Sequence, residues 1–180
     1  MYDQGSRNSL SGIKATVFGG TSPLGAIVGS SLTQMGSTCI YPYRDTATFY
    51  ENKFRELRVT ADLGYKAALK LTDFTDLREV NLTMEESNIV VSTIGSKIYM
   101  QREDQFEESD IRVPMTIARA ARDNPKVKRL IMIGAAGADP NSHSRRLRTK
   151  WLGEQEVKQI YPEVTFLRPT TMVQSLDPNV

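Results

Sequence analysis

A glycine-rich turn between a β-prone run and a helical pattern constrains the fold of this chain more than any other feature. The run extends from Lys14 to Gly20, and apolar residues at helical spacing follow over 24–35. In doubly wound α/β folds, the first strand–turn–helix unit carries the pyrophosphate of a dinucleotide at the helix N-terminus. The pattern therefore predicts a parallel sheet with a ligand crevice at the carboxyl ends of its strands.

The residues of this turn have separable roles. Gly19 permits the tight turn, Gly25 allows close packing of the helix on the sheet, and Ser22 before Pro23 is a typical helix N-cap. A glycine would normally stand at position 22, so two interpretations of Ser22 stay open: its hydroxyl bonds a phosphate oxygen, or it only caps the helix. The predicted cofactor contacts in the turn are Gly19, Thr21, Ser22, Pro23, Leu24 and Gly25.

Strand and helix patterns alternate along the rest of the chain. Further strands are expected at Thr38–Tyr43, Ala67–Leu71, Asn88–Thr93, Arg129–Gly134 and Val164–Arg168. Helices are expected at Asp76–Glu86, Phe106–Asn124 and Arg145–Tyr161. Such alternation, with near-continuous apolar strands, predicts a Rossmann-like α/β fold: a doubly wound parallel sheet with helices on both faces.

Composition and charge narrow the class of protein. The 180 residues include one cysteine, Cys39, so no intrachain disulfide forms, and a reducing compartment is favoured. A net charge of +2 argues against nucleic acid as the main partner, and the longest apolar run, Leu130–Ala138, is too short to span a bilayer. We expect a polar N-terminal tail over 1–12, without a signal- or transit-peptide pattern, and one Rossmann domain over 13–180.

The residue that ends the second strand selects between dinucleotides. A carboxylate there accepts a hydrogen bond from a ribose 2′-hydroxyl, whereas an arginine accommodates a 2′-phosphate. This chain has Arg44 at that point, which favours NADPH over NADH. The alternative is an exposed surface arginine without a ligand.

Several segments together resemble the short-chain dehydrogenase/reductase superfamily, and within it the atypical branch formed by the NADPH-binding accessory subunit of mitochondrial complex I. The resemblance runs from about Ser9 to about Pro169 and rests on Ser11–Gly19, Met35-Gly36-Ser37, Ile40–Arg44, Asp62-Leu63-Gly64, Leu147–Lys150 and Gly153-Glu154. It implies an accessory subunit held by other subunits of the complex, peripheral on the matrix side of the mitochondrial inner membrane. It also implies that most of the family's C-terminal substrate portion is missing here.

The same resemblance bears on catalysis. Lys150 matches the family's active-site lysine, but Arg146 stands where the proton-donating tyrosine would be. The segment Ile133–Gly137 supplies no hydroxyl at the position of the family's serine. An arginine has no proton to exchange at neutral pH, so we expect cofactor binding without turnover. An atypical NADP(H)-dependent reductase and an NADP(H)-sensing regulator remain the alternatives.

Polar residues after the third and fourth strands complete the candidate site. The resemblance implies contacts of Ser92, Thr93 and Gly95 near the nicotinamide ribose. Asp73 is a candidate for the adenine edge, although Thr72-Asp73 is also typical of a turn or helix cap.

Charged clusters elsewhere receive simpler interpretations. A basic cluster opens the last helix against its dipole, which suggests either an anionic partner such as a lipid headgroup or plain solvation. Carboxylates before and in the helix at 106–124 are expected to complement its dipole rather than to bind metal, and His143 is expected to lie in a loop. The basic residues are Arg145, Arg146, Arg148 and Lys150; the acidic ones are Glu103, Asp104, Glu107, Glu108 and Asp110.

Overall fold

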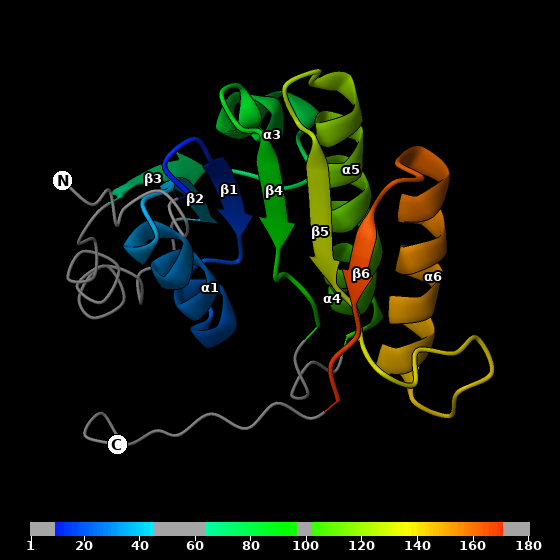
Figure 1. The fold of residues 1–180 in the computed structure, drawn as a ribbon. Coiled ribbons are helices and arrows are strands. Elements are labelled where there is room, and N and C mark those ends of the chain that lie inside the picture. Colours follow the sequence, from blue (N-terminus) through cyan, green and yellow to red (C-terminus); the bar gives the residue numbers. More distant parts are fainter. Residues whose placement is uncertain (1–9, 45–63, 97–101, 171–180) are drawn as a thin grey trace, which may run out of the picture.

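The computed structural model describes residues 10–44, 64–96 and 102–170, which form a six-stranded parallel sheet (Figure 1). The strand order is β3-β2-β1-β4-β5-β6. Successive strands are added on one side of β1 up to β3, and from β4 onward they are added on its other side. The strands are β1 (Lys14–Phe18), β2 (Thr38–Arg44), β3 (Tyr65–Leu71), β4 (Ile89–Ser92), β5 (Arg129–Ile133) and β6 (Thr165–Leu167). This order confirms the doubly wound, Rossmann-like prediction.

Helices lie on both faces of the sheet, as predicted. The first face carries α3, α5 and α6, which contact one another in that order, while α1 packs against β1 and β2 on the second face (Figure 1). The helical segments are α1 (Pro23–Gln34), α3 (Leu77–Met84), α4 (Glu103–Glu107), the π-helix η1 (Glu108–Arg112), α5 (Val113–Asp123) and α6 (Arg145–Ile160). None of the helices in the described ranges is both long and apolar enough to cross a membrane.

Two buried clusters hold the layers together. The larger one lies beneath α3, α5 and α6 and includes Leu130, Ile117 and Val157, all fully buried. The smaller one joins Ala15, Val17, Cys39 and Tyr41 beneath α1. Because neighbouring residues of a strand point to opposite faces, the central strands need apolar side chains at nearly every position, which explains their sequence pattern.

The helix predicted over 106–124 is interrupted. It begins at Glu103 and passes through the π-helical turn η1 before continuing as α5. Pro114 accounts for the interruption: it has no N–H to donate to the carbonyl of Asp110, and its ring crowds that carbonyl. On the neighbouring helix, a Cβ atom at Gly153 would collide with this same carbonyl oxygen, so glycine is required where α6 crosses η1.

Pro42 lies inside β2, two residues before its last residue, Arg44. A proline is tolerated there because β1 pairs with β2 only from Lys14 to Thr16, opposite residues 38–40. Beyond these residues, Pro42 has only β3 as a neighbouring strand.

The residues Asp62 and Leu63 of the family resemblance, and positions 1–9 of the expected tail, lie outside the described residues.

The second face of the sheet is less covered than the first. Side chains at alternate positions of β4, β5 and β6 continue the α1 side of the sheet, as the register of Val17 with Val91 and of Val91 with Ile131 shows. Leu167, in register with Ile133, is 52% exposed on this side. Within the described ranges, α1 is the helix on this face, and it contacts β1 and β2.

The core predicts that substitutions at two leucines differ clearly in their effect on the free energy of unfolding. Leu130 on β5 is fully buried, whereas Leu82 on α3 is 66% exposed. Leu130→Ala should lower the free energy of unfolding by about 2–5 kcal/mol because it leaves a cavity. Leu82→Ala should change it by less than about 0.5 kcal/mol. Urea unfolding followed by circular dichroism measures both, and equal effects would contradict this assignment of the core.

Candidate nucleotide-binding crevice

The glycine turn adopts the backbone that its sequence predicts. Gly19 has φ of +79°, and a Cβ atom there would lie 2.6 Å from the Thr93 hydroxyl. A Cβ atom at Gly25 would overlap the carbonyl of Gly19, so α1 approaches the end of β1 as closely as a backbone allows. The turn therefore has the close approach of strand and helix that a dinucleotide turn requires.

Ser22 caps α1. Its hydroxyl donates to the Gly19 carbonyl at 2.7 Å and accepts from the Gly25 N–H at 3.1 Å. Its one proton is therefore used within the turn, which supports the capping interpretation over the phosphate interpretation. Pro23 has no N–H, so among the first three helical residues Leu24 is the one whose N–H lacks a partner within the helix. Thr21 lies half-buried in the turn.

Arg44 ends β2, as predicted, and already has two partners. Its Nη1 lies 2.9 Å from Oε1 of Glu108, and its guanidinium carbon lies 5.6 Å from the ring centroid of Phe74. Phe74 is itself held edge-to-face against Phe18, with ring centroids 6.0 Å apart. Arg44 is thus a half-exposed cation whose position is fixed by an aromatic ring beneath it and a carboxylate beside it.

Asp73 lies just past β3 and forms a local turn. Its carboxylate accepts from the Thr75 N–H and from the Thr75 hydroxyl, each at 2.7 Å. These hydrogen bonds lower the pKa of Asp73 below its usual range, with smaller contributions from the charges of Arg44 and Arg112. The turn interpretation of Asp73 thus has direct geometric support, and its contact with an adenine edge stays a prediction.

The three residues predicted at the end of β4 lie close to the other groups of the crevice. Ser92 is buried, Thr93 donates to the Phe18 carbonyl at 3.0 Å, and a Cβ atom at Gly95 would collide with Nζ of Lys150. The carboxyl ends of β1 and β4 and the start of α6 therefore meet at one place. This is the switch point of the sheet, where ligands of doubly wound folds bind.

Lys150 is the most constrained of the predicted residues. Its Nζ lies 2.9 Å from Oδ1 of Asp110, and the two side chains are 8% and 0% exposed. The Asp110 carboxylate also accepts from the Ser96 N–H at 2.8 Å and from the Thr149 hydroxyl at 2.9 Å. With three donors around it, the buried carboxylate is well satisfied and keeps Lys150 beneath the crevice.

Two positions that the resemblance relates to catalysis lie at the edge of the crevice. The Nε of Arg146 donates to the Ser96 carbonyl at 3.3 Å, so the residue four before Lys150 borders the crevice as a cation. At the end of β5, Gly134 and Ala135 are both buried and contribute no side-chain hydroxyl.

Three carboxylates have roles that the sequence analysis missed. Glu108 and Asp110 were expected to complement a helix dipole, but they pair with Arg44 and Lys150 instead. Glu154, 3% exposed, pairs with Arg168 at the end of β6, Nε to Oε2 being 2.9 Å, and this raises the pKa of Arg168. Neighbours at i and i+2 point to opposite sides of a helix, so no single-face pattern could have identified Glu108 and Asp110 as a pair of cation partners.

Three of the four basic residues at the start of α6 have side-chain partners within the chain. Arg148 donates to the carbonyls of Ser142 at 2.6 Å and His143 at 3.0 Å, while Arg146 and Lys150 have the partners given above. These contacts offset part of the unfavourable dipole interaction. Within the described ranges, no group of three His, Cys, Asp or Glu side chains is placed to hold a metal ion.

The residues fit a dinucleotide in shape and in the position of one cation. The tight turn ends where Gly25 packs closely against the carbonyl of Gly19. Beside Asp110, the Ser96 Oγ is a buried hydroxyl without a hydrogen-bond partner. Arg44 stands where a 2′-phosphate would lie. The donors differ from the usual pattern, because Ser22 and Pro23 reduce the N–H groups that the turn offers to a pyrophosphate.

Solved structures show the class to which this fold belongs. A short-chain dehydrogenase/reductase from Vibrio parahaemolyticus is 18% identical, with a TM-score of 0.69 over 90% of this chain and 84% of that chain. A UDP-glucuronic acid 4-epimerase from Bacillus cereus in complex with NAD is 14% identical, with a TM-score of 0.68 over 88% of this chain and 57% of that chain. No family model matches the sequence. The fold is the Rossmann-like fold of the short-chain dehydrogenases and epimerases.

Sequence relatives are more specific. The chain is 35% identical over 96% of its length to NADH dehydrogenase (ubiquinone) 1 alpha subcomplex subunit 9, mitochondrial, of Arabidopsis thaliana. It is 36% identical over 94% of its length both to the protein of that name from Mus musculus and to the NADH-ubiquinone oxidoreductase 40 kDa subunit of Neurospora crassa. These matches cover 42–43% of the relatives, so the chain spans about two-fifths of their length. The chain is similar to part of this mitochondrial complex I subunit, which confirms the resemblance.

The buried pair of Lys150 and Asp110 predicts that Lys150 stabilises the fold even when no cofactor is bound. Lys150→Met should lower the free energy of unfolding by about 3–5 kcal/mol, because Asp110 is left as an unpaired buried charge. Lys150→Met combined with Asp110→Asn should recover part of that loss. Lys126→Met, which removes an exposed pair with Glu86, is the matched control and should leave the unfolding midpoint nearly unchanged. An unfolding midpoint unchanged by Lys150→Met would show that the pair does not stabilise the fold.

Proposed function

We propose that this chain is the nucleotide-binding part of an accessory subunit of mitochondrial NADH:ubiquinone oxidoreductase, that it binds NADPH, and that it does not catalyse a reaction on it. The observation that carries the proposal is homology along nearly the whole chain to proteins named as subunits of this complex. On that basis its partners are other subunits of the complex, and its location is peripheral on the matrix side of the inner membrane. The geometry of the crevice supports the remaining parts.

The preference for NADPH is supported by Arg44. A guanidinium at the end of β2 offers two parallel hydrogen bonds to a 2′-phosphate, and Phe74 beneath it limits its freedom before binding. Arg112 lies near this edge and, with Arg44, contributes to lowering the pKa of Asp73. An adenine ribose bearing a phosphate is the form of the dinucleotide that this edge suits best.

The absence of turnover is supported by the start of α6. NADPH supplies a hydride when it is bound in a reductase, and the protein must then supply a proton to the substrate. Arg146 has no proton to give at neutral pH and is turned to the Ser96 carbonyl, while Lys150 is held by Asp110. The residues at these positions therefore hold structure together rather than move a proton.

Assembly into a larger complex is supported by the second face of the sheet. Apolar positions of β5 and β6 on this side, including Leu167, are exposed or half-buried among the described residues. A parallel sheet is stable in water when both faces are covered, so this surface favours further protein contacts.

A nucleotide measurement tests the cofactor proposal. The chain is purified from its native source without added cofactor, denatured, and the released nucleotide is identified and quantified by mass spectrometry. About one NADPH per chain is expected, because Arg44 favours the 2′-phosphate. NADH in place of NADPH, or no nucleotide, contradicts this part of the proposal.

A second measurement tests the assignment to the complex. Mitochondrial membranes are solubilised gently, the respiratory complexes are separated by native electrophoresis, and the chain is located by mass spectrometry. It is expected to migrate with the other subunits of complex I. Its absence from that band overturns the assignment, and turnover of NADPH with a panel of quinones and carbonyl compounds overturns the non-catalytic part.

A further inference from the structure

The π-helix η1 holds two cations of the crevice, Arg44 and Lys150, with its own carboxylates. Glu108 pairs with Arg44 on one side and Asp110 pairs with Lys150 on the other. These pairs differ in burial: Asp110 and Lys150 are almost fully buried, whereas the side chains of Glu108 and Arg44 are 35% and 52% exposed. The buried pair is suited to fix η1, and the exposed pair is suited to exchange with a ligand.

We propose that Glu108 sets how strongly the crevice distinguishes NADP(H) from NAD(H). Without nucleotide, the Glu108 carboxylate pairs with the Arg44 guanidinium, and a 2′-phosphate must displace this carboxylate. A nucleotide without that phosphate leaves the pair in place. This inference rests on the proposed binding of NADPH and assigns a specificity role to a residue of η1.

The position of Glu108 follows from the anchoring of η1. Asp110, two residues later, is held by the Ser96 N–H, the Thr149 hydroxyl and Lys150, and the backbone of η1 packs directly on Gly153. Glu108 therefore starts from a fixed turn and points across to the end of β2. A π-helical turn at this point changes the direction of each side chain, which is a common use of such turns at functional sites.

In this exchange, the 2′-phosphate and the Glu108 carboxylate compete for the guanidinium of Arg44. A phosphate at Arg44 would share its donors with Glu108 or replace it, and the two negative charges would repel each other if both stayed. Asp73 also faces this edge, but its carboxylate is held by Thr75, so it stays in place during the exchange. Among the described residues, Glu108 is the carboxylate paired with Arg44, so its removal should change affinity for the 2′-phosphate.

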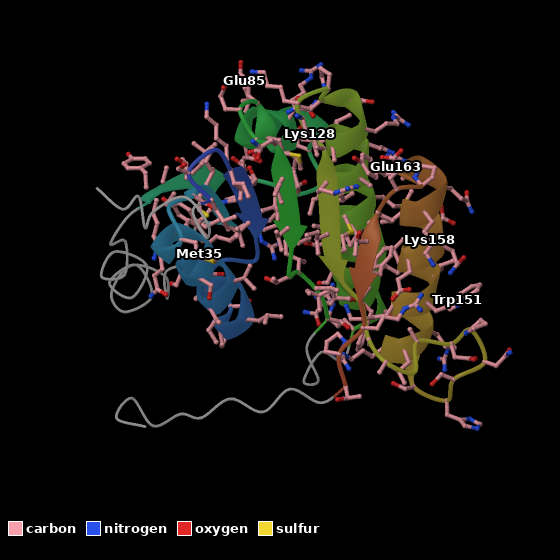
Figure 2. The ribbon with its side chains drawn as sticks, in the orientation of Figure 1. Met35, Glu85, Lys128, Trp151, Lys158 and Glu163 are labelled. Atoms are coloured by element: carbon pink, nitrogen blue, oxygen red, sulfur yellow. The ribbon has the colours of Figure 1, made fainter. Side chains whose placement is uncertain are left out.

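The experiment compares NADPH and NADH binding to the full 180-residue chain and to Glu108→Gln by fluorescence titration. Glu108→Gln should bind NADPH about three- to tenfold more tightly, since Arg44 is no longer occupied by a carboxylate. Its affinity for NADH should change less than about twofold. Glu86→Gln is the charge-matched control: Glu86 pairs with Lys14 at the start of β1, and its neighbour Glu85 lies at the end of the sheet away from the crevice (Figure 2).

A double variant separates occupancy from simple repulsion. In Arg44→Ala, NADPH binding should weaken, and adding Glu108→Gln should give no further gain, because Glu108 acts through Arg44. A gain that persists without Arg44 overturns the occupancy proposal.

The remaining outcomes are also decisive. If the wild-type chain binds NADPH and Glu108→Gln binds it no better, or if Glu108→Gln weakens NADH, the specificity role of Glu108 is wrong while NADPH binding stands. If neither chain binds NADPH, the cofactor proposal fails as well. Thermal unfolding of Glu108→Gln should match the wild type, so that a binding change is not a change in folding.

Discussion

The crevice depends on one buried ion pair, between Lys150 on α6 and Asp110 on η1. Removing two charges from water is costly, and the pair persists because the Asp110 carboxylate accepts from two further donors. Those donors come from the segment after β4 and from α6, so one carboxylate joins three parts of the chain. The relative positions of Gly95, Arg146 and the end of β4 follow from it.

This arrangement gives a catalytic residue type a structural role. A lysine at this place in a reductase must present its charge to the cofactor, but here the charge is neutralised below the crevice. The Arg146 side chain, turned to the Ser96 carbonyl, and the pairing of Lys150 with Asp110 both support the proposal that the crevice binds a nucleotide without turnover. In that proposal, polar groups at the end of the sheet stabilise the protein.

Most of the fold was predictable, because strand and helix periodicities are local and the core strands are nearly continuous in apolar residues. The strand bounds agree within about two residues, and Ser22 was identifiable as a cap from residue type alone. The interruption at η1 was not predicted, since it depends on Pro114 removing a hydrogen bond from a helix that periodicity treats as continuous. The partners of Glu108 and Asp110 lie 64 and 40 residues away, and sequence spacing holds no information on such contacts.

The turn and the arginine edge together indicate where affinity for a dinucleotide must reside. A usual glycine turn supplies several N–H groups to the pyrophosphate, but here Pro23 has none and the Gly25 N–H is taken by Ser22. Less of the binding free energy is then available at the centre of the nucleotide, and the phosphate on the adenine ribose contributes a larger share. A site of this kind is weak for nucleotides in general and selective for those that engage Arg44. Selectivity concentrated at one exposed arginine is sensitive to any carboxylate beside it, which is why Glu108 on the neighbouring π-helix η1 matters for the proposed binding of NADPH.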